Sequence, residues 1–173
     1  MSQAIYIASV ESCAASLGSL SEILAKAAAR EDAATLPAAR LAPDMFPLFA
    51  QVQLACYQAV AGAKRLAGRE AVRPAMQEAD FGALRAHIAE ALQDLAMLTP
   101  DDFAGAAERQ ITMPLQPPMV LEVDGSHFLH RWMLPNFFFH LVTAYDILRA
   151  NGLDIGKKDF LSHAAAFMRQ AGS

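Results

Sequence analysis

Charged residues are scarce in this chain, and no run of like charges occurs in it. Only 18% of its 173 residues are Asp, Glu, Lys or Arg, and the formal net charge is -4. Nucleic-acid binding needs clustered Lys and Arg side chains to neutralise phosphates, whereas the densest basic stretches here are the pairs Lys64-Arg65 and Lys157-Lys158. The composition therefore argues against a nucleic-acid partner.

Cysteines and long apolar runs are also few. The two cysteines, Cys13 and Cys56, do not make a disulfide framework in a chain of this length, so we expect buried, reduced thiols. The longest nearly uninterrupted apolar run, residues 132–145, is shorter than the roughly 20 residues that span a bilayer. The first twenty residues contain no Lys or Arg, unlike a secretory signal. We therefore expect a cytoplasmic protein with no membrane partner.

The strong catalytic motifs are missing as well. The sequence contains no HExxH, no CxxC and no glycine-rich phosphate loop, and neither cysteine has a recognisable histidine partner. His127 and His130 are three positions apart, but zinc or nickel needs at least three N, O or S donors. We expect these two histidines at the surface or at an interface.

Apolar residues are abundant, at 54% of the chain. A chain of this length can bury one full hydrophobic core, so residues 1–173 are expected to form a single domain. This apolar fraction is high for a soluble protein, and it leaves more apolar surface exposed than a monomer usually tolerates. We therefore expect a homodimer.

Apolar residues recur at spacings of three and four along four segments, which predicts four amphipathic helices. The first covers residues 3–30. The second starts at Asp44, with Pro47 in its first turn, and ends before Gly68. The third is capped by Asp80, and the fourth starts near residue 126, is interrupted at Pro135 and closes with residues 151–152.

Between the third and fourth helices the helical period is lost. Short apolar runs at residues 111–115 and 119–123 indicate a small irregular β-hairpin. Long excursions separate the first helix from the second and the third from the fourth. The predicted fold is all-α, a four-helix bundle with crossover connections and this hairpin.

The residue that carries the functional argument is His140, in the predicted fourth helix. Asn136, His140 and Thr143 lie at positions i, i+4 and i+7, so they share one helix face among phenylalanines. A buried imidazole needs a hydrogen-bond partner, which Asn136 or a glutamine of the second helix, Gln51 or Gln53, could supply. Two interpretations stay open, a core histidine that holds helices in register and a ligand or metal pocket.

Two stretches resemble a known family. LPNFFFHLVTAYDILRANG followed by IGKKDFL, and ARLAPDMFPLFAQVQLA nearer the N-terminus, are similar to an uncharacterised domain-of-unknown-function family of the DinB-like and YfiT-like superfamily of metalloenzymes. The resemblance covers nearly the whole chain. It implies a four-helix bundle with crossover connections, usually dimeric, with a metal site between helices near the bundle centre.

The resemblance also implies where a metal would lie. Metal-binding members use one histidine of the second helix and an HxxxH pair of the fourth. His140 matches the second member of that pair, whereas Asn136 and Gln51 stand at the other two positions. Because carboxamides are weak ligands for a divalent transition metal, we expect no metal cofactor, with His140 as the ligand if one binds.

Three hypotheses follow. The first is a metal-free, dimeric, small-molecule-binding or structural protein with Gln51, Asn136, His140 and Thr143 at its pocket. The alternative is a metal-dependent transferase or hydrolase of the superfamily that uses His140, with additional ligands such as His130. The third is a regulatory protein that binds another protein through its surplus apolar surface.

Overall fold

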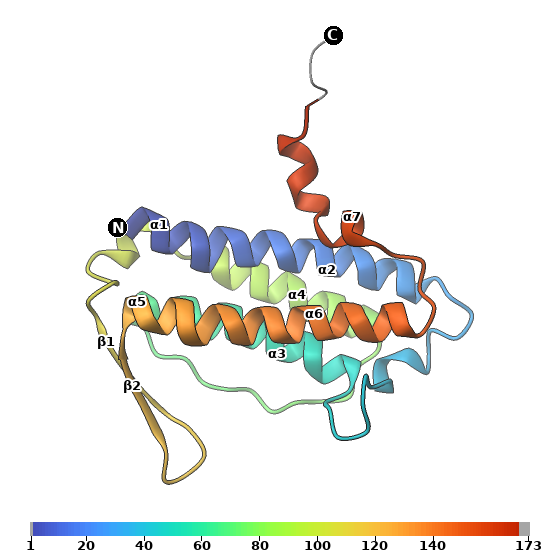
Figure 1. The fold of residues 1–173 in the computed structure, drawn as a ribbon, viewed down its shortest axis with the longest axis horizontal. Coiled ribbons are helices and arrows are strands. Elements are labelled where there is room, and N and C mark those ends of the chain that lie inside the picture. Colours follow the sequence, from blue (N-terminus) through green and yellow to red (C-terminus); the bar gives the residue numbers. More distant parts are fainter. Residues whose placement is uncertain (1, 170–173) are drawn as a thin grey trace.

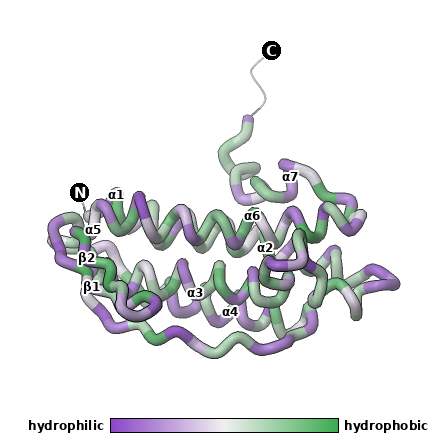
Figure 2. Tube along the Cα trace, turned by 60° about the horizontal axis from the view of Figure 1, so that its bottom comes forward, coloured by the Kyte–Doolittle hydropathy of each residue, from purple (hydrophilic) through white to green (hydrophobic). Residues whose placement is uncertain are grey.

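The long helices of the chain lie side by side and form the predicted bundle, in a computed structural model that describes residues 2–169 (Figure 1). They are α2 (Ser12–Ala28), α3 (Leu48–Leu66), α4 (Phe81–Ala96) and α6 (Leu134–Ala150). Hydrophobic and hydrophilic residues alternate along each helix (Figure 2), and one continuous cluster of buried side chains joins all four. Each helix thus gains its stability by burying an apolar stripe against its neighbours.

Helix α3 packs most extensively on α6 and then on α4, while α2 packs mainly on α4 and less on α6. The consecutive long helices α4 and α6 therefore pack on α3 and α2 and hardly on each other. This confirms a bundle with crossover connections.

The connection that runs along the length of the bundle is residues 67–80, which have no helix or strand (Figure 1). It returns the chain to the end where α3 began, so α3 and α4 run parallel. Gln53 contacts Gln77 near the start of both helices, and Lys64 pairs with Asp94 near their ends. Fourteen extended residues reach about 46 Å, whereas the 19 residues of α3 rise only about 28 Å. The segment is thus long enough to span the bundle.

Two of the predicted helices contain a π-helical turn. The first consists of α1 (Ser2–Tyr6), a π turn at Ile7–Glu11 and then α2. The last consists of α5 (Gly125–Phe128), a π turn at Leu129–Met133 and then α6. The interruption expected at Pro135 therefore lies in the turn just before it, where a proline leaves carbonyls without their usual helical donor.

Three ends of the long helices follow local chemistry. The Asp80 carboxylate accepts from the Ala83 N–H at 2.8 Å and starts α4, which confirms the predicted cap. Gly68 and Gly152 have φ of 73° and 80°, the left-handed conformation expected after α3 and α6. The predicted start of α3 at Asp44 is wrong, because the helix begins at Leu48 with Pro47 as N-cap, and Asp44 lies outside it.

The predicted hairpin is present, with β1 (Gln110–Pro114) antiparallel to β2 (Val120–Asp124) and Ile111 opposite Val123. Short 3-10 helices occur at Leu36–Ala38, Pro100–Phe103 and Ser162–Phe167, and α7 (Lys157–Phe160) follows α6. Within residues 2–169, no helix has the length and apolar character needed to cross a bilayer.

Candidate functional site

His140 and Gln51 meet between the two helices that pack most extensively on each other. Gln51 lies on α3 and is 1% exposed, and His140 lies on α6 and is 9% exposed. Their neighbours on both helices, among them Leu48, Phe137 and Leu141, are buried hydrophobic residues. The bundle therefore holds an imidazole and a carboxamide in a largely apolar interface.

A hydrogen bond of 2.8 Å joins His140 Nδ1 to Gln51 Oε1. The Gln51 amide nitrogen donates to the carbonyl oxygen of Phe46 at 3.2 Å. The Phe46 carbonyl can only accept a hydrogen bond, so the Gln51 amide must direct its nitrogen to Phe46 and its oxygen to His140. The Gln51 oxygen can also only accept. His140 must therefore carry its proton on Nδ1, which leaves Nε2 as a lone-pair acceptor.

The His140 ring is neutral near pH 7. Burial, the larger cause, and the positive charge of Arg73 together lower its pKa from 6.5 to about 4. Arg73 belongs to the exposed segment 67–80, and its guanidinium carbon lies 5.9 Å from the centre of the Tyr57 ring. Nothing in the sequence pattern associates Arg73 with His140.

The second nitrogen of His140 has a different environment. Nε2 has no hydrogen-bond partner within residues 2–169, yet no fully buried side-chain nitrogen or oxygen in that range lacks one. Nε2 is therefore not completely buried, although the His140 residue as a whole is only 9% exposed. A group that donates an O–H or N–H could reach it from outside the bundle.

The other predicted pocket residues use their polar groups locally. Asn136 is half-buried and donates to the carbonyl of Trp132 at 2.7 Å, and the Thr143 hydroxyl donates to that of Phe139 at 2.6 Å. Gln53 bonds the backbone of Gln77. Of the candidate partners, the structure brings only Gln51 to His140.

The remaining histidines on α5, the π turn and the C-terminal segment each have a structural partner. His127 bonds the carboxylate of Asp124, and His130 bonds the carbonyl of Ser126 one turn earlier. His163 contacts the hydroxyl of Ser19 on α2. The expectation of His127 and His130 as surface residues agrees with this placement, since both are exposed.

Comparison with known proteins gives the chain a family. The domain of unknown function DUF1993 matches residues 5–161. The chain belongs to this family. A crystal structure of a DinB family member protein from Shewanella denitrificans is 34% identical, with a TM-score of 0.86 over 99% of this chain and 97% of that one. No curated protein matches the sequence.

The family match and the solved structure together establish an uncharacterised DinB-like protein. They confirm the resemblance and the mostly helical fold with its small hairpin. Because a DinB-like fold is associated with metal binding, the donor groups of this DUF1993 chain decide whether a metal fits.

The donors around His140 do not fit a transition metal. The amide of Gln51 bonds to His140 and Phe46, and that of Asn136 bonds to the backbone. Within residues 2–169 no three His, Cys, Asp or Glu side chains are grouped closely enough to hold an ion. Neutral amides bind borderline metals weakly compared with imidazole, thiolate or carboxylate, so His140 and its neighbours are a poor ligand set for metal-centred catalysis.

Thiol chemistry has no support either. Cys13 and Cys56 are free and buried, and burial raises the pKa of each thiol to about 12. A thiol is nucleophilic only as the thiolate. Both cysteines are therefore inert at neutral pH.

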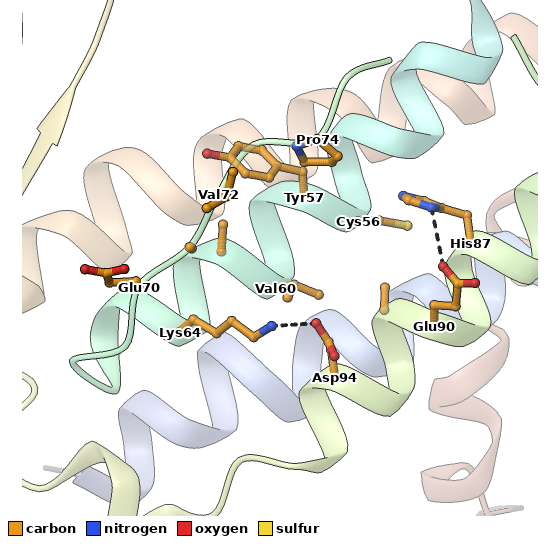
Figure 3. Close-up of a pocket in the computed structure, with 13 residues that line it drawn as sticks. Cys56, Tyr57, Val60, Lys64, Glu70, Val72, Pro74, His87, Glu90 and Asp94 are labelled. Carbon is orange, nitrogen blue, oxygen red and sulfur yellow. Dashed lines mark hydrogen bonds and ion pairs between the residues drawn. The ribbon is translucent and has the colours of Figure 1, made fainter. Parts of the chain in front are cut away.

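A cavity of about 460 Å³ lies beside α3, between this helix, α4 and the segment 67–80 (Figure 3). None of the four predicted pocket residues lines it. Sequence reasoning missed it because its outer wall is segment 67–80, which has no periodic pattern to place it on the bundle.

Proposed function

We propose that this DUF1993 protein is a metal-free, small-molecule-binding member of the DinB-like fold, formed as one domain by residues 1–173 and acting as a cytoplasmic homodimer. The observation that carries the proposal is the hydrogen bond between His140 and Gln51. Where the superfamily resemblance implies an imidazole on the second helix, an amide stands instead and selects the tautomer of His140.

The acceptor nitrogen of His140 supports a binding role. Nε2 carries a lone pair at the edge of the bundle, and the Arg73 guanidinium is close enough to depress the pKa of the ring. A small molecule with a hydroxyl or N–H donor beside an electron-rich oxygen would match this pair. Asn136 and Thr143, on the same face of α6, form the proposed rim of that site.

Exposed apolar side chains on α6 support the homodimer. Phe138, Phe139 and Val142 are 38%, 55% and 39% exposed, although the sequence pattern places the phenylalanines in the core. Residues three and four positions apart are neighbours on a helix, so these three form one patch. A second copy of the chain would remove this patch from water.

The test is elemental analysis of protein purified without an affinity tag, together with native mass spectrometry for a co-purified ligand. We expect less than about one-tenth of a transition-metal ion per chain, because the donors are amides. One metal per chain, lost in His140→Ala, would contradict the proposal and favour the superfamily's metal-dependent transferase or hydrolase chemistry.

A further inference from the structure

We propose that the cavity beside α3 is a second binding site, independent of His140, for an organic amine with an apolar body. The cavity has an apolar floor and an acidic rim, and these come from elements that no sequence pattern brings together. Its volume of about 460 Å³ lies within the range of small-molecule sites, roughly 300–1,000 Å³.

Small side chains create the space. Cys56 and Ala61 of α3 face Ala91 of α4, and all three are buried. Larger side chains at these positions would fill the cavity. The high pKa of Cys56 keeps its thiol neutral, so the floor carries no charge and suits a hydrocarbon or aromatic group.

The wall opposite α4 is the segment 67–80, and side chains of α3 hold it in place. The Gln53 amide donates to the Gln77 carbonyl at 2.7 Å and accepts from the Gln77 N–H at 3.1 Å. The Arg65 guanidinium donates to the carbonyl of Ala71 at 3.3 Å. These contacts fix both ends of a stretch that otherwise has no secondary structure, and they keep Val72 and Pro74 over the cavity (Figure 3).

The charged side chains that line the cavity favour a cationic ligand. One cation, Lys64, and three carboxylates, those of Glu70, Glu90 and Asp94, line the cavity. Lys64 and Asp94 pair at 2.6 Å. This leaves two carboxylates that form no ion pair with a Lys or Arg in residues 2–169.

Glu90 lies 4.0 Å from His87, which carries charge only when protonated. Figure 3 shows Glu70 and Glu90 at different ends of the cavity, with Val60 and Cys56 between them. An ammonium group at the rim would therefore gain a carboxylate partner while its apolar body covers the floor. Glu70 and Glu90 would repel an anionic ligand, and Arg65 and Arg73 already lie against the ring of Tyr57, each 5.9 Å from its centre.

The experiment uses three probes of one shape, namely 4-phenylbutan-1-amine, 4-phenylbutan-1-ol and 4-phenylbutanoate. Binding to the full chain is measured by calorimetry, and the site is located by amide chemical-shift changes. We expect the amine to bind one per chain, at least about five-fold more tightly than the alcohol and more tightly still than the acid. The shifts should lie in α3, α4 and residues 67–80.

Variants separate this site from the one at His140. Glu90→Gln should weaken binding of the amine about two- to five-fold, which is the range expected for one exposed ion pair. The double variant Glu70→Gln with Glu90→Gln should weaken it about ten-fold. The matched control Glu122→Gln, on β2, and His140→Gln should leave its affinity unchanged. Val60→Trp should fill the cavity and abolish binding, with the fold checked by circular dichroism.

Equal affinity for the amine and the alcohol, or binding that Glu70→Gln with Glu90→Gln leaves unchanged, would overturn the inference. So would an absence of amine binding to the wild-type chain. Loss of amine binding in His140→Gln would show that the two sites are one. A metal found at His140 would contradict the proposed function and leave the cavity site standing.

Discussion

Phe139 and His140 are adjacent in the chain and their rings meet edge to face, with centroids 5.3 Å apart, yet they face different surroundings. His140 turns towards α3 and is 9% exposed, whereas Phe139 is 55% exposed. The proposed dimer patch of Phe138, Phe139 and Val142 and the proposed His140 site are thus adjacent on α6 but point in different directions.

The Phe139 patch gives the first prediction. Phe139→Glu should convert a dimer into a monomer of 18.6 kDa, because a carboxylate would have to be desolvated against a second apolar patch. Light scattering coupled to size-exclusion chromatography measures the mass. Met97→Glu, a change of the same kind at a 74% exposed position, is the control. A wild-type chain that elutes as a monomer would rule out the homodimer.

The low pKa of His140 makes stability depend on pH. The pKa in the folded chain is about 4 against an ordinary value of 6.5, so between these values the unfolded chain binds the extra proton. The contribution of His140 to the free energy of unfolding is therefore fully present above pH 6.5 and is lost as the pH falls towards 4. Between about pH 7 and pH 5 the loss should be about 1–2 kcal/mol.

Urea unfolding at the two pH values measures this loss. His140→Gln removes the titrating ring, so the difference between about pH 7 and pH 5 should shrink by about 1–2 kcal/mol. His87→Gln, at a half-exposed ring on α4, should leave the difference unchanged. An equal pH dependence in wild type and His140→Gln would mean that His140 is not held neutral by burial.

The anchor of the segment 67–80 gives a third prediction. Gln53→Ala removes both hydrogen bonds to Gln77, but Gln77 is exposed and water replaces its partners. Global stability should fall by only about 1 kcal/mol, whereas amide exchange in residues 69–79 should rise strongly. Gln58→Ala, on the same helix with no bond to this segment, is the control. Unchanged exchange would show that other contacts hold the segment.

The features that sequence predicts correctly are those with local chemistry. Asp80 caps α4 because a carboxylate can reach the N–H groups of its own first turn. Gly152 closes α6 because its left-handed φ suits glycine. Neither feature depends on distant parts of the chain.

The features that sequence misses depend on tertiary packing. Residues 67–80 have no period, so nothing local shows that they run along α3 and bring Arg73 towards His140. Phe137, Phe138 and Phe139 are consecutive on α6 and span about 200° of the helix, so Phe137 is buried while Phe138 and Phe139 face outward, although their run of apolar neighbours suggests a core. From sequence alone, Gln51 is one of several possible hydrogen-bond partners of His140, and only the packing of the helices into the bundle decides between them.

The last prediction restores the donors that the superfamily resemblance implies. Gln51→His with Asn136→His should create a zinc site with His140, since Gln51 already lies within 2.8 Å of the His140 ring and Asn136 is one helical turn away. Three imidazoles are a common zinc ligand set, with Zn–N distances of about 2.0–2.1 Å. We expect one zinc per chain in the double variant and none in wild type, measured by elemental analysis after dialysis. Adding His140→Ala to the double variant should abolish binding, because two imidazoles alone hold zinc weakly. A double variant that folds but stays free of zinc would show that Gln51, Asn136 and His140 do not occupy the positions of a metal triad.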